Sequence, residues 1–447
     1  MQLDVFMGER LMGRLSFDAE SNQYDFEYDS DWLAAVDAFP LAPSLPLAPE
    51  TQWSAEVRSR AARIFFENLL PEGQALDDAA RAYSVSKASV AGLLAVLGSE
   101  TAGALRILLP RHQVESTPSV ETLRPVPWNE LSERIRSRAQ LPFSVWDRKV
   151  RLSIAGFQDK LAVYQETPGK WFLANGAQLA STHILKPDPA NPLLSGLTSN
   201  EFFCMRLAEA AGLPTAEVQL FHVPEPVLLV TRFDRVPESG KVHRLPVIDG
   251  CQALGLPVGS KYERPFGNSK DVRDIRTGAS LARFFELLRA TARPAAERIA
   301  LLRWVIFQVL IGNTDAHAKN LSFLCGPGGL TLAPAYDLVA GLLYAENQVE
   351  DTYAMAIGDA FRPGDVSAYE WATLGRVAKL SPTLVHRELT NLARKVTAAL
   401  PTVMAKVLKE GGQESVVRCI EALVRRECAR QTELAGSIAA MAKLDDA

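Results

Sequence analysis

The chain has 447 residues, of which 47% are hydrophobic and 22% charged, and its formal net charge is -4. This length exceeds a single compact core and predicts roughly two to four domains. The small net charge excludes a whole-protein field that would attract nucleic acid or an anionic membrane. Five scattered cysteines without a Cys-x-x-Cys pair argue against a zinc site or a disulfide framework. We find neither a signal-peptide pattern nor an apolar run of about 18 residues, so we expect a cytoplasmic protein that does not enter a membrane.

The first 110 residues are expected to form a small α+β unit. Leu3, Val5 and Met7 alternate with polar residues before Gly8, a pattern typical of a β-hairpin. Helical periodicity marks residues 57–70, which end at a Pro-Glu-Gly stop, and residues 86–97, whereas residues 104–109 are predicted to be a strand. Residues 112–127 are polar and proline-spaced, so we expect residues 111–142 to be a linker with one short charged helix.

Residues 143–235 have the order of elements found in a nucleotide-binding lobe. A strand, a loop of small residues around Gly156 and a second strand follow one another. Such a hairpin lets backbone N–H groups approach a phosphate, because bulky side chains do not intervene. A single glycine in a hairpin is more often only a turn residue, so this signal is weak by itself.

The next strand, residues 182–187, contains Lys186 near its end. A lysine at the end of a strand is usually solvated. In the functional interpretation its ammonium binds nucleotide phosphates, and Glu201, at the start of a helix over residues 200–211, is the carboxylate that holds it extended. Strands are predicted at residues 218–220 and 227–230, and the second leads into Thr231, Arg232 and Phe233. We expect a hinge there, whose backbone groups would read the adenine edge.

Residues 236–447 are predicted to form an all-helical lobe. Apolar residues recur with helical spacing over residues 279–291, 294–311, 367–380, 381–400 and 415–439. We interpret these stripes as core. No repeat of solenoid length is present in the sequence.

A short polar loop at residues 312–320 carries the most specific signal in the chain. Asp315 and Asn320 have the separation found in the kinase catalytic loop H-R-D-x-x-x-x-N, where the Asp orients the attacking hydroxyl and the Asn holds magnesium. Asp337 lies in an apolar context farther on, where a second metal ligand is expected, although Asp is also a common helix N-cap. His317 alone is more often a structural histidine. A hydrolytic metal site with His317 and Asp315 would lack the further histidines that such sites recruit.

With these motifs in this order, the sequence resembles the HipA family of bacterial serine/threonine kinases, the toxins of HipBA-type toxin–antitoxin pairs. Asp-x-His-x-Lys-Asn is a specific match, and the resemblance covers nearly the whole chain. The other matching segments are Pro43 to Leu47, Phe65 to Pro71, Ser153 to Lys160, His183 to Lys186, Asn200-Glu201, Arg232 to Arg235, Cys251 to Pro257, Lys261 to Glu263 and Tyr336-Asp337.

The resemblance implies a bilobal kinase-like α+β fold with an extra N-terminal subdomain and an all-helical C-terminal lobe. It implies ATP and Mg²⁺ as cofactors, Asp315 as the catalytic base, and Asn320 and Asp337 as magnesium ligands. It assigns Lys186 to the ATP phosphates and makes Ser153 the autophosphorylated serine. Ser153, Ile154, Ala155, Gly156, Phe157, Gln158 and Lys160 form its phosphate loop, and Glu201, Thr231, Arg232, Phe233, His317, Lys319 and Tyr336 complete its nucleotide site.

The resemblance also implies a helix-turn-helix antitoxin of the HipB type as partner, contact with DNA mainly through that antitoxin, and a translation component such as an aminoacyl-tRNA synthetase as substrate. Two other functions stay open from the residues. One is a small-molecule phosphotransferase, since antibiotic and sugar kinases also use an Asp…Asn loop. The other is an inactive kinase-like scaffold that acts as a corepressor.

Overall fold

The computed structural model describes residues 1–48, 53–110, 122–147, 149–151, 158–175, 179–238, 241–347 and 350–444. The chain divides into two compact units. The first comprises Met1–Pro187, Phe221–Val258 and Leu324–Gly329, and the second comprises Asp188–Leu220, Gly259–Phe323 and Leu330–Ala447. Within the described residues, no helix is both long enough and apolar enough to cross a bilayer.

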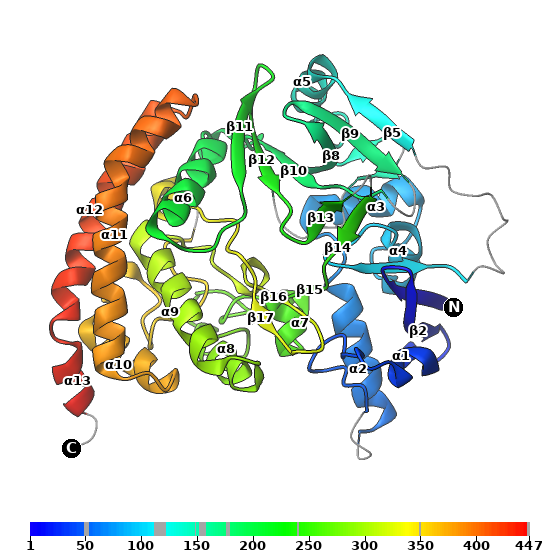
Figure 1. Ribbon diagram of the computed structural model, residues 1–447, viewed down its shortest axis with the longest axis horizontal. Helices are drawn as coiled ribbons and strands as arrows, with labels where there is room; N and C mark the ends of the chain where they lie inside the picture. Colours follow the sequence, from blue (N-terminus) through cyan, green and yellow to red (C-terminus); the bar gives the residue numbers. More distant parts are fainter. Residues whose placement is uncertain are drawn as a thin grey trace. The chain divides into compact units, whose positions relative to one another are not determined.

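The N-terminal part of the first unit is an antiparallel sheet with the strand order β3-β2-β1-β4, accompanied by helices α1 to α4 (Figure 1). Val5 and Ile107 face each other in register and are fully buried, so β4 closes the subdomain onto its first hairpin. The predicted hairpin, both helices and the strand are therefore confirmed. The elements are β1 (Gln2–Met7), β2 (Arg10–Asp18), β3 (Gln23–Tyr28), α1 (Ser30–Ala34), α2 (Ala55–Glu67), α3 (Gly73–Tyr83), α4 (Val90–Leu97) and β4 (Leu105–Leu108).

A second antiparallel sheet lies in the first unit. Five strands of this sheet lie wholly in the first unit, and they are neighbours in the order β12-β10-β8-β9-β5. Leu161, Leu173 and Leu185 are fully buried in its core, together with Leu131 of α5. The elements of this sheet and its helix are β5 (Thr122–Val126), α5 (Trp128–Arg136), β8 (Leu161–Thr167), β9 (Lys170–Asn175), β10 (His183–Pro187) and β12 (Pro226–Thr231), while β11 (Val218–His222) carries the chain in from the second unit. The same unit contains the strand pairs β6 (Val145–Trp146) with β7 (Lys149–Val150) and β13 (Arg235–Glu238) with β14 (Lys241–Arg244), followed by β15 (Val247–Asp249) and α7 (Gly250–Leu254).

Two expectations about these elements were wrong, and one helix was missed. Residues 122–126 are not linker but strand β5, and Pro125 is tolerated there because β5 is at the edge of the sheet. The predicted Pro-Glu-Gly stop does separate two helices, but helix α3, which begins at Gly73, was not predicted. The chain also does not turn helical directly after Arg235, because β13 and β14 pair with each other first.

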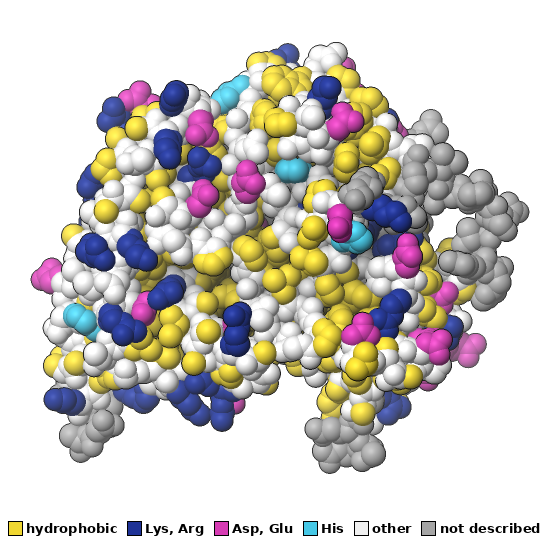
Figure 2. Space-filling view, in the orientation of Figure 1, with side chains coloured by type: hydrophobic (Ala, Val, Ile, Leu, Met, Phe, Trp, Pro, Cys, Tyr) yellow, Lys and Arg dark blue, Asp and Glu magenta, His cyan; other side chains and the backbone are white. Residues whose placement is uncertain are grey.

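The second unit is mainly helical. Its long helices α11 and α12 run side by side (Figure 1), and Leu392, Val396 and Val424 are among their buried residues. Figure 2 shows Lys and Arg side chains over these two helices, and some pair with acidic residues one turn away, as Arg418 does with Glu414 at 2.6 Å. The elements are α6 (Leu197–Ala211), α8 (Leu281–Leu287), α9 (Pro294–Ile311), β17 (Thr331–Leu332), α10 (Ala368–Val377), α11 (Pro382–Lys409), α12 (Glu414–Ala435) and α13 (Ile438–Leu444), while β16 (Ser322–Leu324) starts in this unit and ends in the first.

Candidate active site

Helix α9 delivers the polar loop of residues 312–320. It begins with Pro294 at its first position and ends at Gly312, which has a left-handed φ of 65°. A Cβ at Gly312 would lie 2.8 Å from Leu342 Cδ1, so glycine is required both by the backbone conformation and by the close packing. The helix therefore stops where the sequence predicts, and the loop starts from a fixed point.

Asn313 fixes the first turn of this loop. Its side chain is 1% exposed; Nδ2 donates to Gln308 Oε1 at 2.8 Å and Oδ1 accepts from the Asp315 N–H at 3.0 Å. Asp315 itself is exposed, although residues 311–314 and 316–319 are all buried. The loop thus presents one carboxylate to solvent from a rigid, buried support.

Asn320 and Asp315 are joined directly. The Asn320 side-chain Nδ2 and the His317 backbone N–H both donate to the Asp315 carbonyl oxygen, each at 2.8 Å. A one-turn 3₁₀ helix over Ala318–Asn320 places Asn320 for this contact. Because Nδ2 of Asn320 donates this hydrogen bond, the other polar atom of its side chain, Oδ1, is the one suited to bind a cation. The spacing of five residues therefore brings the two predicted functional groups together in space.

The segment that carries Asp337 packs on the same loop. The Tyr336 hydroxyl donates to the Lys319 carbonyl at 2.7 Å and lies 2.6 Å from Ser322 Oγ. The Leu342 N–H donates to the Gly312 carbonyl at 3.0 Å. Asp337 has a φ of 52°, a left-handed conformation that Asp tolerates better than most residues. These contacts tie Tyr336 and Leu342, which lie on either side of Asp337 in the sequence, to the loop.

The two residues predicted as metal ligands have side chains that are chemically suited to magnesium. An amide oxygen from Asn320 and a carboxylate from Asp337 are hard oxygen ligands, the type that Mg²⁺ prefers. Among the described residues no group of three or more His, Cys, Asp or Glu side chains forms a metal cluster. Sparse protein ligation is usual for Mg²⁺ held together with nucleotide phosphates, which provide further oxygens.

The other predicted residues that the structure describes are divided between the two units. Lys186 is on β10, opposite Leu228, and is 5% exposed, and the Gln158 side chain donates to the adjoining Pro187 carbonyl at 2.9 Å. Lys160 is likewise buried in the first unit, whereas Glu201 is buried on α6 of the second. The remaining residues of the phosphate loop, Ser153 to Phe157, fall outside the described residues.

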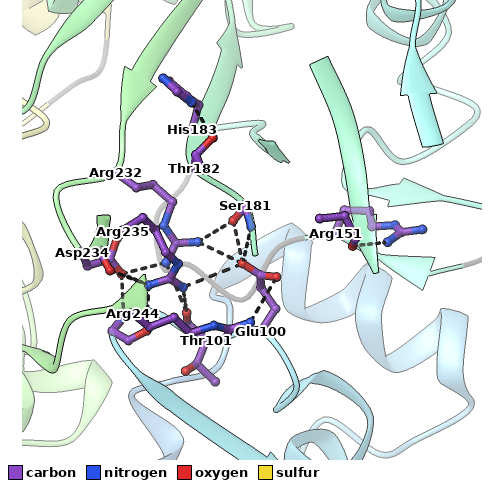
Figure 3. Close-up of polar contacts among 12 residues, drawn as sticks. Glu100, Thr101, Arg151, Ser181, Thr182, His183, Arg232, Asp234, Arg235 and Arg244 are labelled. Carbon is purple, nitrogen blue, oxygen red and sulfur yellow. Dashed lines mark hydrogen bonds and ion pairs between the residues drawn. The ribbon is translucent and has the colours of Figure 1, made fainter. Parts of the chain in front are cut away.

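Arg232, predicted at the hinge, belongs to a buried ion cluster of the first unit (Figure 3). Its Nε and Nη2 donate to the two carboxylate oxygens of Asp234 at 3.0 and 2.8 Å, and its Nη1 donates to Ser181 Oγ at 2.8 Å. Arg235 donates to Asp234 at 2.8 Å, and Arg232, Arg235 and Arg244 all lie within 3.8 Å of Glu100. The Arg232 side chain therefore links the segment after β12 to the N-terminal subdomain.

The charges in this cluster shift the pKa values of its members. Burial favours a higher pKa for Asp234, but Arg232 and Arg235 outweigh it and hold that pKa well below its usual range. Burial together with the charge of Arg232 lowers the pKa of Arg235 to about 9. Burial also favours a higher pKa for Glu100, but Arg244, Arg235 and Arg232 outweigh it and hold that pKa below its usual value. Both carboxylates are therefore ionised at neutral pH.

Two residues that bind Asp315 had no predicted role. The Tyr262 hydroxyl donates to Asp315 Oδ1 at 2.7 Å, and Asn313 holds the Asp315 backbone as described above. Asn313 lies two residues before Asp315, so its position was a usable signal. Tyr262 lies 53 residues before Asp315, and only its place in Lys261-Tyr262-Glu263 marked it.

Comparisons with known proteins cover nearly the whole chain. Family models match for a HipA N-terminal domain over residues 3–108 and a HipA-like C-terminal domain over residues 152–404. A protein of Shewanella oneidensis named serine/threonine-protein kinase toxin HipA is 37% identical over 412 residues, which cover 90% of this chain and 89% of the relative. A putative kinase of Sinorhizobium fredii is 34% identical over 450 residues, with 99% and 98% of the two chains covered.

A solved structure gives the same result for the fold. HipA in a complex with HipB and operator DNA from Shewanella oneidensis MR-1 matches with a TM-score of 0.85 and 34% identity over 98% of this chain and 99% of its own. This likeness confirms the kinase-like α+β fold that the sequence predicts.

Proposed function

The chain belongs to the HipA family of serine/threonine protein kinases, and we propose that Asp315, Asn320 and Asp337 form the centre where it transfers a phosphoryl group from ATP to a protein hydroxyl. The observation that carries this proposal is the shared Asp315 carbonyl, which ties Asn320 to the exposed Asp315 within one rigid turn. A base and a metal ligand held at fixed separation are what phosphoryl transfer requires, because its catalysis is mainly positioning and charge stabilisation.

Each residue then has a defined task. The Asp315 carboxylate orients the acceptor hydroxyl and takes its proton as that oxygen bonds to the γ-phosphorus and the bond to ADP breaks. Asn320 and Asp337 would hold Mg²⁺, which when bound neutralises charge on the phosphates. Lys186 would contact those phosphates, with Glu201 as its partner.

The remaining assignments concern the nucleotide site and its regulation. The phosphate loop, from Ser153 to Gln158 with Lys160, would cover the phosphates, and the backbone at Thr231 and Phe233 would contact adenine. His317, Lys319 and Tyr336 would support the nucleotide site from the catalytic loop. Phosphorylation of Ser153 would place a dianion beside the ATP phosphates, and the repulsion would silence the enzyme.

The biological setting follows from the relatives. The Shewanella relative is named a kinase toxin, and its structure contains HipB and operator DNA. By likeness, this chain would be the toxin of a toxin–antitoxin pair, would bind a HipB-like helix-turn-helix antitoxin, and would reach DNA mainly through it. Its substrate would be a component of translation, and an aminoacyl-tRNA synthetase is our specific proposal.

The test is transfer of label from [γ-³²P]ATP in a cleared cell extract, with Asp315→Asn as the matched impaired variant. We expect label on one or a few proteins with the parent chain, and labelling of the same proteins at a rate about 10²-fold or more lower with Asp315→Asn. Label on metabolites alone would instead support a small-molecule phosphotransferase. Equal growth inhibition by both chains without any labelling would support an inactive corepressor scaffold.

The Ser153 assignment has its own test. Ser153→Ala should continue to label extract proteins and should lose label on the kinase itself, since the acceptor hydroxyl is gone. Full self-labelling of Ser153→Ala, located by peptide mass spectrometry, would assign autophosphorylation to another residue.

A further inference from the structure

A segment far from the catalytic loop in sequence, Lys261-Tyr262-Glu263, contacts that loop at three places. The Ala318 N–H donates to the Lys261 carbonyl at 3.0 Å. The Tyr262 ring meets the His317 ring edge-on, with centroids 5.1 Å apart and planes at 88°. The Tyr262 hydroxyl donates to Asp315 Oδ1 at 2.7 Å. The three contacts together fix the position of the Tyr262 backbone and the orientation of its side chain relative to the loop.

The segment is itself anchored from its other side by Glu263, which is 3% exposed. Its carboxylate accepts from the Ala356 N–H at 2.8 Å and from Arg276 Nε at 2.7 Å, while its backbone N–H donates to the Ala354 carbonyl at 2.9 Å. A Cβ at Gly278 would lie only 1.8 Å from the Tyr262 carbonyl oxygen, so the backbones pack closely there. Tyr262 therefore stands on a rigid base.

We propose that Tyr262 is a positioning residue for phosphoryl transfer, which holds the Asp315 carboxylate in the orientation needed to receive the proton of the acceptor hydroxyl. The inference rests on the proposed role of Asp315. The torsion that rotates a carboxylate about its Cβ–Cγ bond is soft. A charge-assisted hydrogen bond from a fixed phenol restricts that rotation. Misplacement of a reacting group by about 1 Å can cost about 10²-fold in rate.

Tyr262 constrains the carboxylate of Asp315 directly, whereas the two asparagines act on its backbone. Asn313 and Asn320 bind the backbone N–H and the carbonyl of Asp315, so they fix where the residue starts. The phenol of Tyr262 binds the carboxylate oxygen itself. Asn313 and Asn320 thus act on backbone atoms of Asp315 and Tyr262 on its carboxylate, so removal of the Tyr262 hydroxyl should alter catalysis without displacing the loop.

The experiment compares Tyr262→Phe, Asp315→Asn, the double variant and the parent chain in the [γ-³²P]ATP extract assay. Tyr353→Phe is the matched control, because the buried Tyr353 hydroxyl has no hydrogen-bond partner among the described residues. We expect Tyr262→Phe to lower the rate at saturating ATP about 10- to 100-fold, the scale of one hydrogen bond to a charged group. We expect the KM for ATP and the thermal midpoint to stay near those of the parent, and Tyr353→Phe to keep the parent rate.

The double variant separates positioning from a structural role. If Tyr262 acts through Asp315, the double variant should be as slow as Asp315→Asn alone, since nothing remains to be positioned. Multiplied losses, a raised KM for ATP with an unchanged maximal rate, or a parent-like rate in Tyr262→Phe would each overturn the inference. A parent-like rate in Asp315→Asn would instead overturn the proposed function, so the two failures are distinguishable.

Discussion

The substitution Asp234→Asn should strongly destabilise the first unit, because it removes the charge at the centre of the arginine cluster. Asp234 accepts from Arg232 Nε and Nη2, from Arg235 Nη1 and from the Gly103 N–H, at 3.0, 2.8, 2.8 and 2.8 Å. Its side chain is 9% exposed. An asparagine keeps one acceptor oxygen but turns an NH₂ group toward guanidinium donors. Removing one partner of a buried ion pair costs about 3–5 kcal/mol, and we expect a loss of unfolding free energy in that range.

Asp37→Asn provides the matched control. Asp37 pairs with Arg10 at 2.8 Å, but the two side chains are 56% and 46% exposed. Exposed ion pairs contribute about 0–1 kcal/mol, so this variant should remain close to the parent. Urea unfolding followed by tryptophan fluorescence measures both variants at pH 7. A loss for Asp234→Asn no greater than that for Asp37→Asn would refute the reasoning.

The pH dependence of the Asp234→Asn effect follows from the lowered pKa of Asp234 in the folded state. An unfolded Asp titrates near 3.9. A carboxyl group whose folded pKa is depressed contributes its full stability above the unfolded pKa, and loses it as pH falls toward the folded pKa. The difference between parent and Asp234→Asn should therefore stay constant from about pH 5.5 to 8 and shrink below about pH 4. A stability difference between the two chains that grew as the pH fell would contradict a lowered pKa of Asp234 in the folded state.

Three further predictions concern the catalytic loop and its support. Gly278→Ala should lower the free energy of unfolding by about 1–3 kcal/mol and also lower the labelling rate, because the new Cβ would meet the Tyr262 carbonyl. The control Gly364→Ala should change neither quantity, because a Cβ there meets nothing within 4 Å. Tyr336→Phe should cost about 1–2 kcal/mol in urea unfolding, since its hydroxyl joins Lys319 and Ser322. Asp337→Asn should raise the Mg²⁺ concentration for half-maximal labelling at least about tenfold, as expected for a lost metal ligand; an unchanged Mg²⁺ titration would remove Asp337 from the metal site.

The parts of the site that the sequence predicts are those set by local spacing. Asp315 and Asn320 lie five residues apart on one turn, so a short motif is enough to bring them together. The same holds for the end of α9 at Gly312, because a glycine after an apolar helical run is a common C-cap.

The parts that escaped prediction depend on contacts between distant segments. Tyr262 reaches Asp315 across 53 residues, and Arg232 bonds to Thr101 across 131 residues, so neither contact leaves a periodic pattern in the sequence. Strand β5 was hidden by Pro125, since a proline argues against a strand unless that strand is known to be at an edge. Tertiary packing, and not local propensity, decided these cases.

The most direct test of the central claim is the maximal rate of phosphoryl transfer by Asp315→Asn, measured beside its affinity for a fluorescent ATP analogue with Mg²⁺. The account predicts a rate about 10²-fold or more below that of the parent, with nucleotide affinity retained, because Asp315 acts on the acceptor hydroxyl and not on nucleotide binding. A parent-like rate in Asp315→Asn would contradict the assignment of this loop as the catalytic centre.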